Sequence, residues 1–311
     1  MILKKIFTYL LLVICLSYVV REFIYVGLRK NTVGEFDKLN TIFIKQNNYD
    51  ALIIGSSRAE SHFVPFVIDS TTGLNSFNAG QSGAMQEMNL TVLRSYFVHN
   101  TPPKVVVLNI DIHLPNTGRD TIHHFPKYFA YLGNDTLYDH LKEQDQRFKY
   151  FKWIPFYSLP YTNDYYLSAS LRGWLGMAGE RSKTYLKGFT PEQKWVEDAD
   201  KDQYHAINYS FPPTFYKSIN NIIADCKQNN IKLVMVVSPL YYRLSEMIVN
   251  RTTTIAMLKQ LANNNDAIFM DYTTDDICTK KEYFVNSRHL NKAGACKFSQ
   301  KFGADLLQYL R

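Results

Sequence analysis

The sequence predicts an α/β protein in which helices cover both faces of a mostly parallel β-sheet. Short apolar runs at 51–54, 104–111 and 232–239 are rich in Val, Ile and Leu. They lack the polar alternation of half-exposed strands, as expected for strands buried on both faces. Longer segments with helical spacing lie between them, and this alternation is typical of three-layer α/β folds.

The elements follow one another from about residue 50. Strands are expected at 51–54, 76–80, 104–111, 232–239 and 267–272, and helices at 85–100, 213–230, 245–265 and 291–310. The helix at 213–230 has the clearest pattern, because Ile219, Ile222 and Cys226 share one face. Residues 31–48 are interpreted as a polar linker leading into a short helix.

The N-terminal segment 1–30 predicts a membrane anchor, which leaves 31–311 as the folded domain. Fifteen largely apolar residues, Ile6 to Val20, follow two lysines. As a helix they cover ~22 Å of a ~30 Å hydrocarbon core. The segment has no good small-x-small cleavage site. An uncleaved transmembrane signal anchor is therefore favoured over a cleaved signal peptide or a buried amphipathic helix.

The charges around this segment predict its orientation. Lys4 and Lys5 place the N-terminus in the cytoplasm and the domain outside it, in the periplasm or another extracytoplasmic space. Arg29 and Lys30 on the far side oppose this orientation.

Residues 112–212 interrupt the strand–helix alternation. They contain all three tryptophans, Trp153, Trp174 and Trp195, and a stretch with no clean period, "WIPFYSLPYTNDYY". We interpret the segment as an insertion that packs its own aromatic residues, or as a lid over the active site.

Composition excludes some classes of function. The net charge is +7, but no run of five like charges marks a nucleic-acid-binding arm. No Cys/His spacing predicts a metal site, and His123–His124 is interpreted as a solvated loop. No cofactor is expected. A Cys278–Cys296 disulfide is left open.

Polar residues lie at four places near the carboxyl ends of the predicted parallel strands. Ligands of such sheets bind beyond these ends. Gly55-Ser56-Ser57 follows the first strand, and "NAGQSG" (78–83) follows the second. The third strand carries Asn109 and Asp111, and His289 precedes the last helix.

These residues and their order resemble the SGNH (GDSL-type) hydrolase superfamily over about 50–110 and 230–311. The resemblance implies a flavodoxin-like fold with Ser57 as the nucleophile and His289 as the base. It implies Gly80 as an oxyanion-hole donor. The anchor and the "GSSR" turn are similar to membrane-anchored members that acylate or deacylate cell-envelope polymers.

Two positions depart from the family pattern. Asp111 falls where the family has an asparagine, and a carboxylate cannot donate to an oxyanion. Either Asn109 or a backbone N–H must then be the second oxyanion-hole donor, or the hole is incomplete. Asn286 replaces the aspartate that would orient His289 and stabilise its charged form. Either Asn286 serves as a weak partner or a carboxylate beyond the last strand replaces it. The candidates for that carboxylate are Asp271, Asp275 and Asp276.

Ser57 also has interpretations without catalysis. Ser57 and Glu60 fit an S-x-x-E capping box, and a helix N-terminus can bind an anion. Arg58 is expected to be solvated or to line the wall of the site. His62 is expected to point away from Ser57.

The predicted function is a serine esterase, acyltransferase or deacetylase that acts on ester groups of a cell-envelope glycan or a related polymer. The alternative is a catalytically weak or inactive domain. Such a domain would bind an envelope polysaccharide or a membrane acyltransferase partner.

Overall fold

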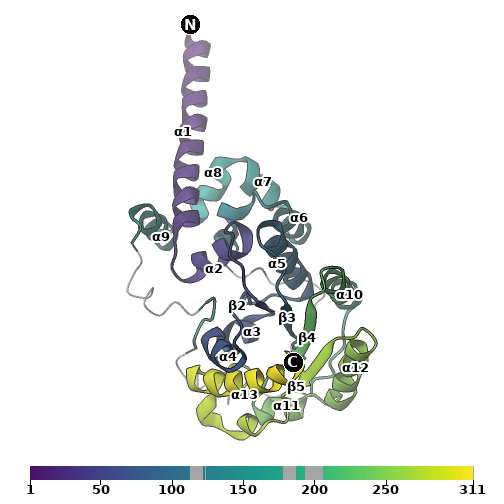
Figure 1. Ribbon diagram of the computed structural model, residues 1–311. Helices are drawn as coiled ribbons and strands as arrows, with labels where there is room; N and C mark the ends of the chain where they lie inside the picture. Colours follow the sequence, from purple (N-terminus) through teal and green to yellow (C-terminus); the bar gives the residue numbers. More distant parts are fainter. Residues whose placement is uncertain (113–121, 123, 178–186, 193–205, 311) are drawn as a thin grey trace. The chain divides into compact units, whose positions relative to one another are not determined.

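The computed structural model describes residues 1–112, 122, 124–177, 187–192 and 206–310. The chain forms two compact units (Figure 1). Met1–Gln46 and His124–Tyr185 form the anchor unit, and Asn47–His123 and Leu186–Arg311 form the sheet unit. This division differs from the expected boundaries at residue 30 and at 112–212, because part of the insertion belongs to the same unit as the N-terminal helices.

The sheet unit contains a five-stranded parallel sheet with the order β2-β1-β3-β4-β5. The strands are β1 (Ala51–Ile54), β2 (Ser76–Asn78), β3 (Val105–Asn109), β4 (Lys232–Val237) and β5 (Ile268–Asp271). This is the flavodoxin-like strand order, in which ligands bind beyond the carboxyl ends of the strands. The predicted fold class is confirmed.

Helices cover both faces of this sheet. They are α3 (Ser57–His62), α4 (Pro65–Thr72), α5 (Gln86–His99), α10 (Pro213–Gln228), α11 (Tyr242–Met247), α12 (Arg251–Asn263) and α13 (Lys292–Leu310), with 3₁₀ turns η5 (Asp276–Thr279) and η6 (Lys281–Tyr283). On one face, Ile53, Val107 and Val236 pack with residues of α3, α4 and α13. On the other, α5 and α10 pack together and contact β1 and β4 respectively.

The expected helix at 245–265 is divided into α11 and α12. Between them the backbone pairs with another segment: Ile207 N donates to Met247 O at 2.7 Å, and Val249 N to Ile207 O at 3.0 Å. Asn250 exchanges side-chain hydrogen bonds with the backbone of Tyr209. These bonds replace the helical ones and end the helix.

The anchor unit is helical throughout its described part. Its elements are α1 (Ile2–Lys30), α2 (Gly34–Phe43), η1 (Phe125–Tyr131), α6 (Asp135–Gln144), α7 (Phe148–Trp153), α8 (Pro155–Ser158), η2 (Leu159–Tyr161) and α9 (Asp164–Leu175). The supposed linker at 31–48 contains α2, whose Phe36, Leu39 and Phe43 are buried. It is therefore part of a core.

Helix α1 has two different halves. Its 29 residues are long and apolar enough to cross a membrane. Most side chains before Ser17 are exposed, whereas Arg21, Ile24 and Leu28 are buried in the anchor unit.

All four cysteines are free thiols in the structure. The Cys278 thiol is buried and donates to Tyr272 O at 3.2 Å, so Cys278 and Cys296 are not paired.

Candidate active site

The turn after β1 positions the candidate nucleophile. Gly55 has φ +151°, and a Cβ there would lie 2.6 Å from Ala59 Cβ, so only glycine fits without a shift. Ser56 is the N-cap of α3, and its Oγ accepts from Arg58 N at 3.2 Å. The expected capping box of Ser57 and Glu60 is therefore wrong. Ser57 is the first helical residue, and its hydroxyl is free for another partner.

That partner is His289, which lies 232 positions later in the chain. Ser57 Oγ and His289 Nε2 are 2.8 Å apart, within the reach expected of a nucleophile and its base. His289 directly precedes the Leu290 backbone that leads into α13, and α13 packs beside α3. The packing of these two helices brings the residues together.

Asn286 fixes the orientation of the histidine ring. Its Oδ1 lies 2.9 Å from the N–H groups of both Arg288 and His289, and 3.1 Å from His289 Nδ1. Only an oxygen can accept from two backbone N–H groups, so the amide orientation is determined. His289 Nδ1 must then carry the proton, which leaves the Nε2 lone pair directed at the Ser57 hydroxyl.

The surroundings keep this imidazole neutral. Burial and the nearby Arg58 guanidinium lower the pKa of His289 to about 4, while the Asp111 carboxylate acts in the opposite direction. His289 is therefore unprotonated at neutral pH and able to accept a proton. Its basicity is low because of this burial and the nearby cation, and Asn286 contributes no negative charge to oppose them.

A buried ion pair lies beside the nucleophile. Arg58, expected to be solvated or in the wall, is 1% exposed. Its Nη1 lies 2.8 Å from Asp111 Oδ1, and its Nη2 donates to Ser238 O and Pro239 O. The Ser56 hydroxyl also donates to Asp111. Asp111 therefore holds the nucleophile turn and neutralises a buried cation.

The two expected oxyanion donors differ in availability. The Gly80 N–H donates to Asn78 Oδ1 at 3.0 Å, and a Cβ at Gly80 would lie 2.6 Å from Glu60 N. The Gly80 N–H is already bound to Asn78 and is not available to an oxyanion. Close packing against Glu60 explains why this position is a glycine. Asn109 Oδ1 accepts from Ser238 N at 3.2 Å, and its Nδ2 makes a long 3.4 Å contact with Asp111. The Asn109 amide therefore keeps donor capacity.

A second glycine in the same loop was not among the expected site residues. Gly83 has φ +79° in a turn closed by Ala84 N and Gln81 O at 2.9 Å, and Gln81 N binds Gly55 O. Within the described part of the chain, the N–H groups of Gly83 and Ser57 have no acceptor. The "GQSG" spacing is compatible with either glycine, so the sequence alone could not choose between them.

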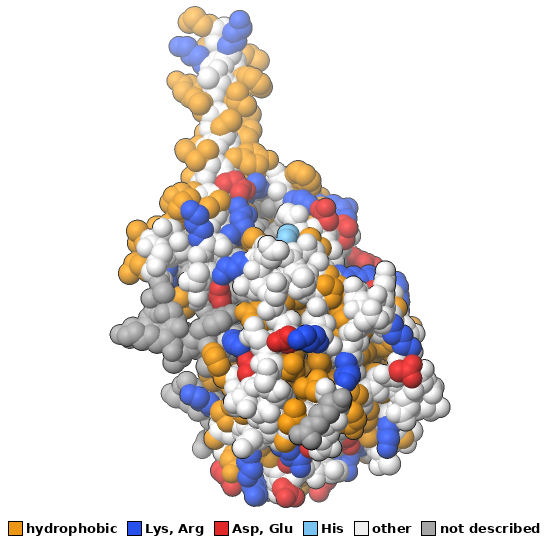
Figure 2. Space-filling view, viewed as in Figure 1, with side chains coloured by type: hydrophobic (Ala, Val, Ile, Leu, Met, Phe, Trp, Pro, Cys, Tyr) orange, Lys and Arg blue, Asp and Glu red, His pale blue; other side chains and the backbone are white. Residues whose placement is uncertain are grey.

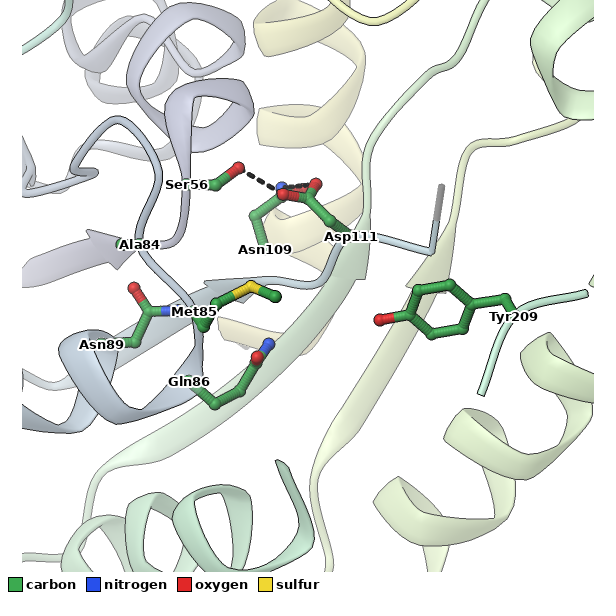
Figure 3. Close-up of a pocket in the computed structure, with 8 residues that line it drawn as sticks. All are labelled: Ser56, Ala84, Met85, Gln86, Asn89, Asn109, Asp111 and Tyr209. Carbon is green, nitrogen blue, oxygen red and sulfur yellow. Dashed lines mark hydrogen bonds between the residues drawn. The ribbon is translucent and has the colours of Figure 1, made fainter. Parts of the chain in front are cut away.

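A small cavity of about 10 Å³ opens beside this turn (Figure 3). It is lined by Ser56, Ala84, Met85, Gln86, Asn89, Asn109, Asp111 and Tyr209. This volume holds about one water molecule. Figure 3 shows Ser56 and Asn109 directed at Asp111 on one side and the Tyr209 hydroxyl facing the space from the other.

The three aspartates considered as alternative partners of His289 have other contacts or are exposed. Asp271 accepts from Thr273 N at 2.9 Å. Asp275 accepts from Ile277 N at 3.0 Å and pairs with Lys301 at 2.8 Å. The Asp276 side chain is exposed on η5. Among the described residues, Asn286 is the partner of His289 Nδ1.

His62 points away from Ser57, as expected, but it contributes to the site. The His62 ring is fully buried. Its Nδ1 lies 3.0 Å from Ser238 Oγ, and its Nε2 accepts a hydrogen bond from Leu290 N at 3.1 Å. It therefore connects α3 to the residue after His289.

Two remaining expectations concern metals and the paired histidines. Within the described ranges, no group of three or more His, Cys, Asp or Glu could hold a metal ion. His123 of the expected solvated loop and Trp195 of the insertion lie outside the described residues.

Comparison with known proteins adds little to this geometry. No protein-family model and no curated protein matches the chain. A crystal structure described as a "putative acylhydrolase" from Bacteroides fragilis covers 87% of this chain and 94% of its own, with 13% identity and a TM-score of 0.40. A match at this level carries no information about activity.

Proposed function

We propose that the protein is a serine esterase or acyltransferase of the SGNH type that acts on oxygen esters. The observation that carries this proposal is the continuous contact from Ser57 Oγ to His289 Nε2 and from His289 Nδ1 to Asn286 Oδ1. A helix cap would require none of this, because Ser56 already caps α3.

In the first half of the reaction, Ser57 Oγ attacks the ester carbonyl while His289 Nε2 takes the hydroxyl proton. The carbonyl oxygen becomes an oxyanion, which the free N–H groups of Ser57 and Gly83 and the Asn109 amide stabilise. Collapse breaks the ester bond, and His289 returns the proton to the leaving alcohol. The acyl group remains on Ser57 until water or another hydroxyl removes it.

The surroundings of the serine favour a short acyl group. The cavity beside Ser56 holds only about one water molecule, so any acyl chain that entered it would have to displace Met85 or Tyr209. An acetyl group, on an envelope polysaccharide, is the proposed substrate because it needs the least displacement. The α1 anchor would hold the enzyme at the membrane, with its N-terminus cytoplasmic and the domain outside the cytoplasm. A membrane acyltransferase stays a predicted partner.

One observation favours a second candidate, an inactive domain that binds glycan or a membrane partner. Asn286 cannot stabilise an imidazolium by charge, and the pKa of His289 is only about 4. In serine proteases the equivalent Asp-to-Asn change lowers turnover about 10⁴-fold.

Covalent labelling separates the two candidates. A serine-directed fluorophosphonate should label the wild-type protein and the Ser56→Ala variant, but not the Ser57→Ala or His289→Ala variants. Peptide mapping should place the adduct on Ser57. A correctly folded wild-type protein that resists labelling would favour the inactive domain, and an adduct on Ser56 would refute the assignment of the nucleophile.

A further inference from the structure

The anchor unit exposes large apolar side chains on the helices that pack against α1. Six of them form what we call the aromatic collar: Trp153, Ile154, Phe156, Leu171, Trp174 and Leu175. Leu175 is 70% exposed and Trp153 is 63% exposed. Soluble surfaces rarely expose so many large apolar groups together, and such patches mark contact sites for proteins or membranes.

The α7–α8 part of the collar lies where α1 leaves the anchor unit. Tyr18 Oη donates to Trp153 O at 2.7 Å, and Arg21 Nη1 donates to Lys152 O at 3.1 Å. Beyond this point, toward the N-terminus, most side chains of α1 are exposed. Trp153 therefore lies at the boundary between the packed and free parts of α1.

Helix α9 brings the rest of the collar toward the same end. Asn31 Nδ2 donates to Ala169 O at 2.7 Å, whereas Trp174 Nε1 donates to Phe23 O at 2.9 Å. Later residues of α9 thus meet earlier residues of α1, so the two helices are antiparallel. Its exposed C-terminal turn, with Leu171 and Leu175, points toward the free part of α1.

The length of the free helix indicates what covers this surface. Ile6 to Val20 span ~22 Å, about 8 Å less than a ~30 Å hydrocarbon core. If α1 crosses a bilayer, residues 21–25 must lie at its boundary, and Trp153 and Trp174 of the collar lie next to this part of α1. Amphipathic surfaces enter a membrane by about 5–10 Å, which matches the missing length.

The chemistry of the collar also fits a lipid surface. Tryptophan is enriched at membrane interfaces, where its ring is apolar and its N–H is polar. Cations lie beside the rings: Lys30 Nζ is 4.0 Å from the Trp174 ring and Lys152 Nζ is 5.5 Å from the Trp153 ring. Lysines in such places can reach lipid phosphates. Figure 2 shows hydrophobic side chains along α1 and continuing onto the surface next to it.

We propose that the aromatic collar is embedded in the interfacial layer of the bilayer that α1 spans. The proposal rests on membrane anchoring by α1 and is independent of the proposed esterase activity. The collar completes a span that α1 alone leaves short, and it gives residues 124–177 a role other than that of an active-site lid.

Depth-dependent fluorescence quenching tests this proposal on the full chain in phosphatidylcholine nanodiscs. Each protein keeps one tryptophan, at position 153 or 174, with the others changed to phenylalanine. Tyr9→Trp on free α1 is the positive control, and Val249→Trp, exposed in the sheet unit, is the negative control. Lipids brominated near the carbonyl end or deep in the acyl chains are the quenchers, and unbrominated lipid is the reference.

The proposal expects at least two-fold quenching of Trp153 and Trp174 by shallow bromines, less by deep ones, and none at position 249. Quenching at position 9 but at neither collar position would overturn it and leave the collar for a membrane-protein partner. No quenching at position 9 would overturn both the anchor and the collar. Fluorophosphonate labelling of the same samples reports the esterase proposal separately.

Discussion

Both units of this protein bury charged side chains, but the anchor unit also exposes a group of large apolar ones. The sheet unit places charged and polar side chains inside, where Arg58, Asp111, His62 and His289 are held by specific bonds. The anchor unit places large apolar side chains outside, around the end of α1. We propose that the buried polar groups of the sheet unit serve catalysis and that the exposed apolar groups of the anchor unit serve attachment to a membrane. Burying a polar group is costly unless it is hydrogen-bonded, and exposed apolar patches mark contact sites.

The largest expected effect sharpens the catalytic side of this comparison. Ser57→Ala should lower esterase activity on a nitrophenyl acetate by about 10³-fold or more, because it removes the attacking oxygen. Stability should hardly change, since Ser57 is not the cap. Ser56→Ala should do the reverse, costing about 1 kcal/mol in urea unfolding while activity remains. Equal activity loss in both variants would contradict this division of roles.

Arg58→Met tests whether the buried ion pair matters for stability. It leaves Asp111 without its cation, and breaking one side of a buried pair costs about 3–5 kcal/mol. The matched control is Arg94→Met, which removes the more exposed pair with Asp225 and should cost about 0–1 kcal/mol. Chemical unfolding of the wild type and the two variants measures both changes in the free energy of unfolding. Similar losses in the two variants would show that the Arg58–Asp111 pair stabilises the fold no more than an exposed pair does.

Gly173→Ala tests the packing of the anchor unit. A Cβ at Gly173 would lie 1.8 Å from Gly27 O, so α9 would have to move away from α1. Overpacking of this kind costs about 1–3 kcal/mol. Gly133→Ala, where nothing lies within 4 Å, is the control and should be neutral. Thermal unfolding of the full chain in detergent gives the comparison, and an unchanged midpoint for Gly173→Ala would refute the close contact.

Asn286→Asp should raise esterase turnover about ten-fold, because a carboxylate would stabilise the imidazolium formed in the transition state. The acid limb of the kcat/KM profile should also move to higher pH, since the carboxylate raises the pKa of His289. Asp276→Asn, whose side chain is exposed, should change neither quantity. If Asp276→Asn or Asp275→Asn silenced the enzyme instead, the assignment of Asn286 as the partner would be wrong.

The last expected effect concerns pH. The pKa of His289 is about 4 when folded and about 6.5 when unfolded. Between these values the unfolded chain binds the proton first, so stability should fall as pH decreases from about 6.5 to 4. Urea unfolding at pH 7 and pH 4.5 measures the loss, which should be smaller in His289→Gln. An equal loss in that variant would assign the effect to other groups.

The sheet unit was largely predictable because its signals are local. Buried runs such as 104–111 and 232–239 become strands wherever both faces are covered, and their order placed Ser57, Asn109 and His289 at one edge. The environment of Arg58 could not be predicted, because its partner lies 53 positions away. The choice between Gly80 and Gly83 likewise depends on a side-chain bond from Asn78.

For the anchor unit, the sequence predicted the apolar N-terminal segment but not the helices that pack around it. The apolar N-terminus indicated a span, and a short helix was expected within 31–48, but the burial of α2 in a core was missed because its apolar face is short and interrupted by charged residues. Residues 124–177 have no clean period, since η1, α7 and α8 are short and pack their aromatics in several directions. Only the three-dimensional contacts of α9 with α1 show which side chains are left outside.

The long separation between Ser57 and His289 has a consequence for biosynthesis. The turn that carries Ser57 is made early, whereas His289 lies 232 positions later, directly before α13. Contacts so distant in sequence form late in folding. A ribosome-bound chain therefore carries Ser57 without its histidine partner until His289 and α13 have been synthesised. The packing of α13 against α3 and α4 then sets the moment at which the contact between Ser57 and His289 can form.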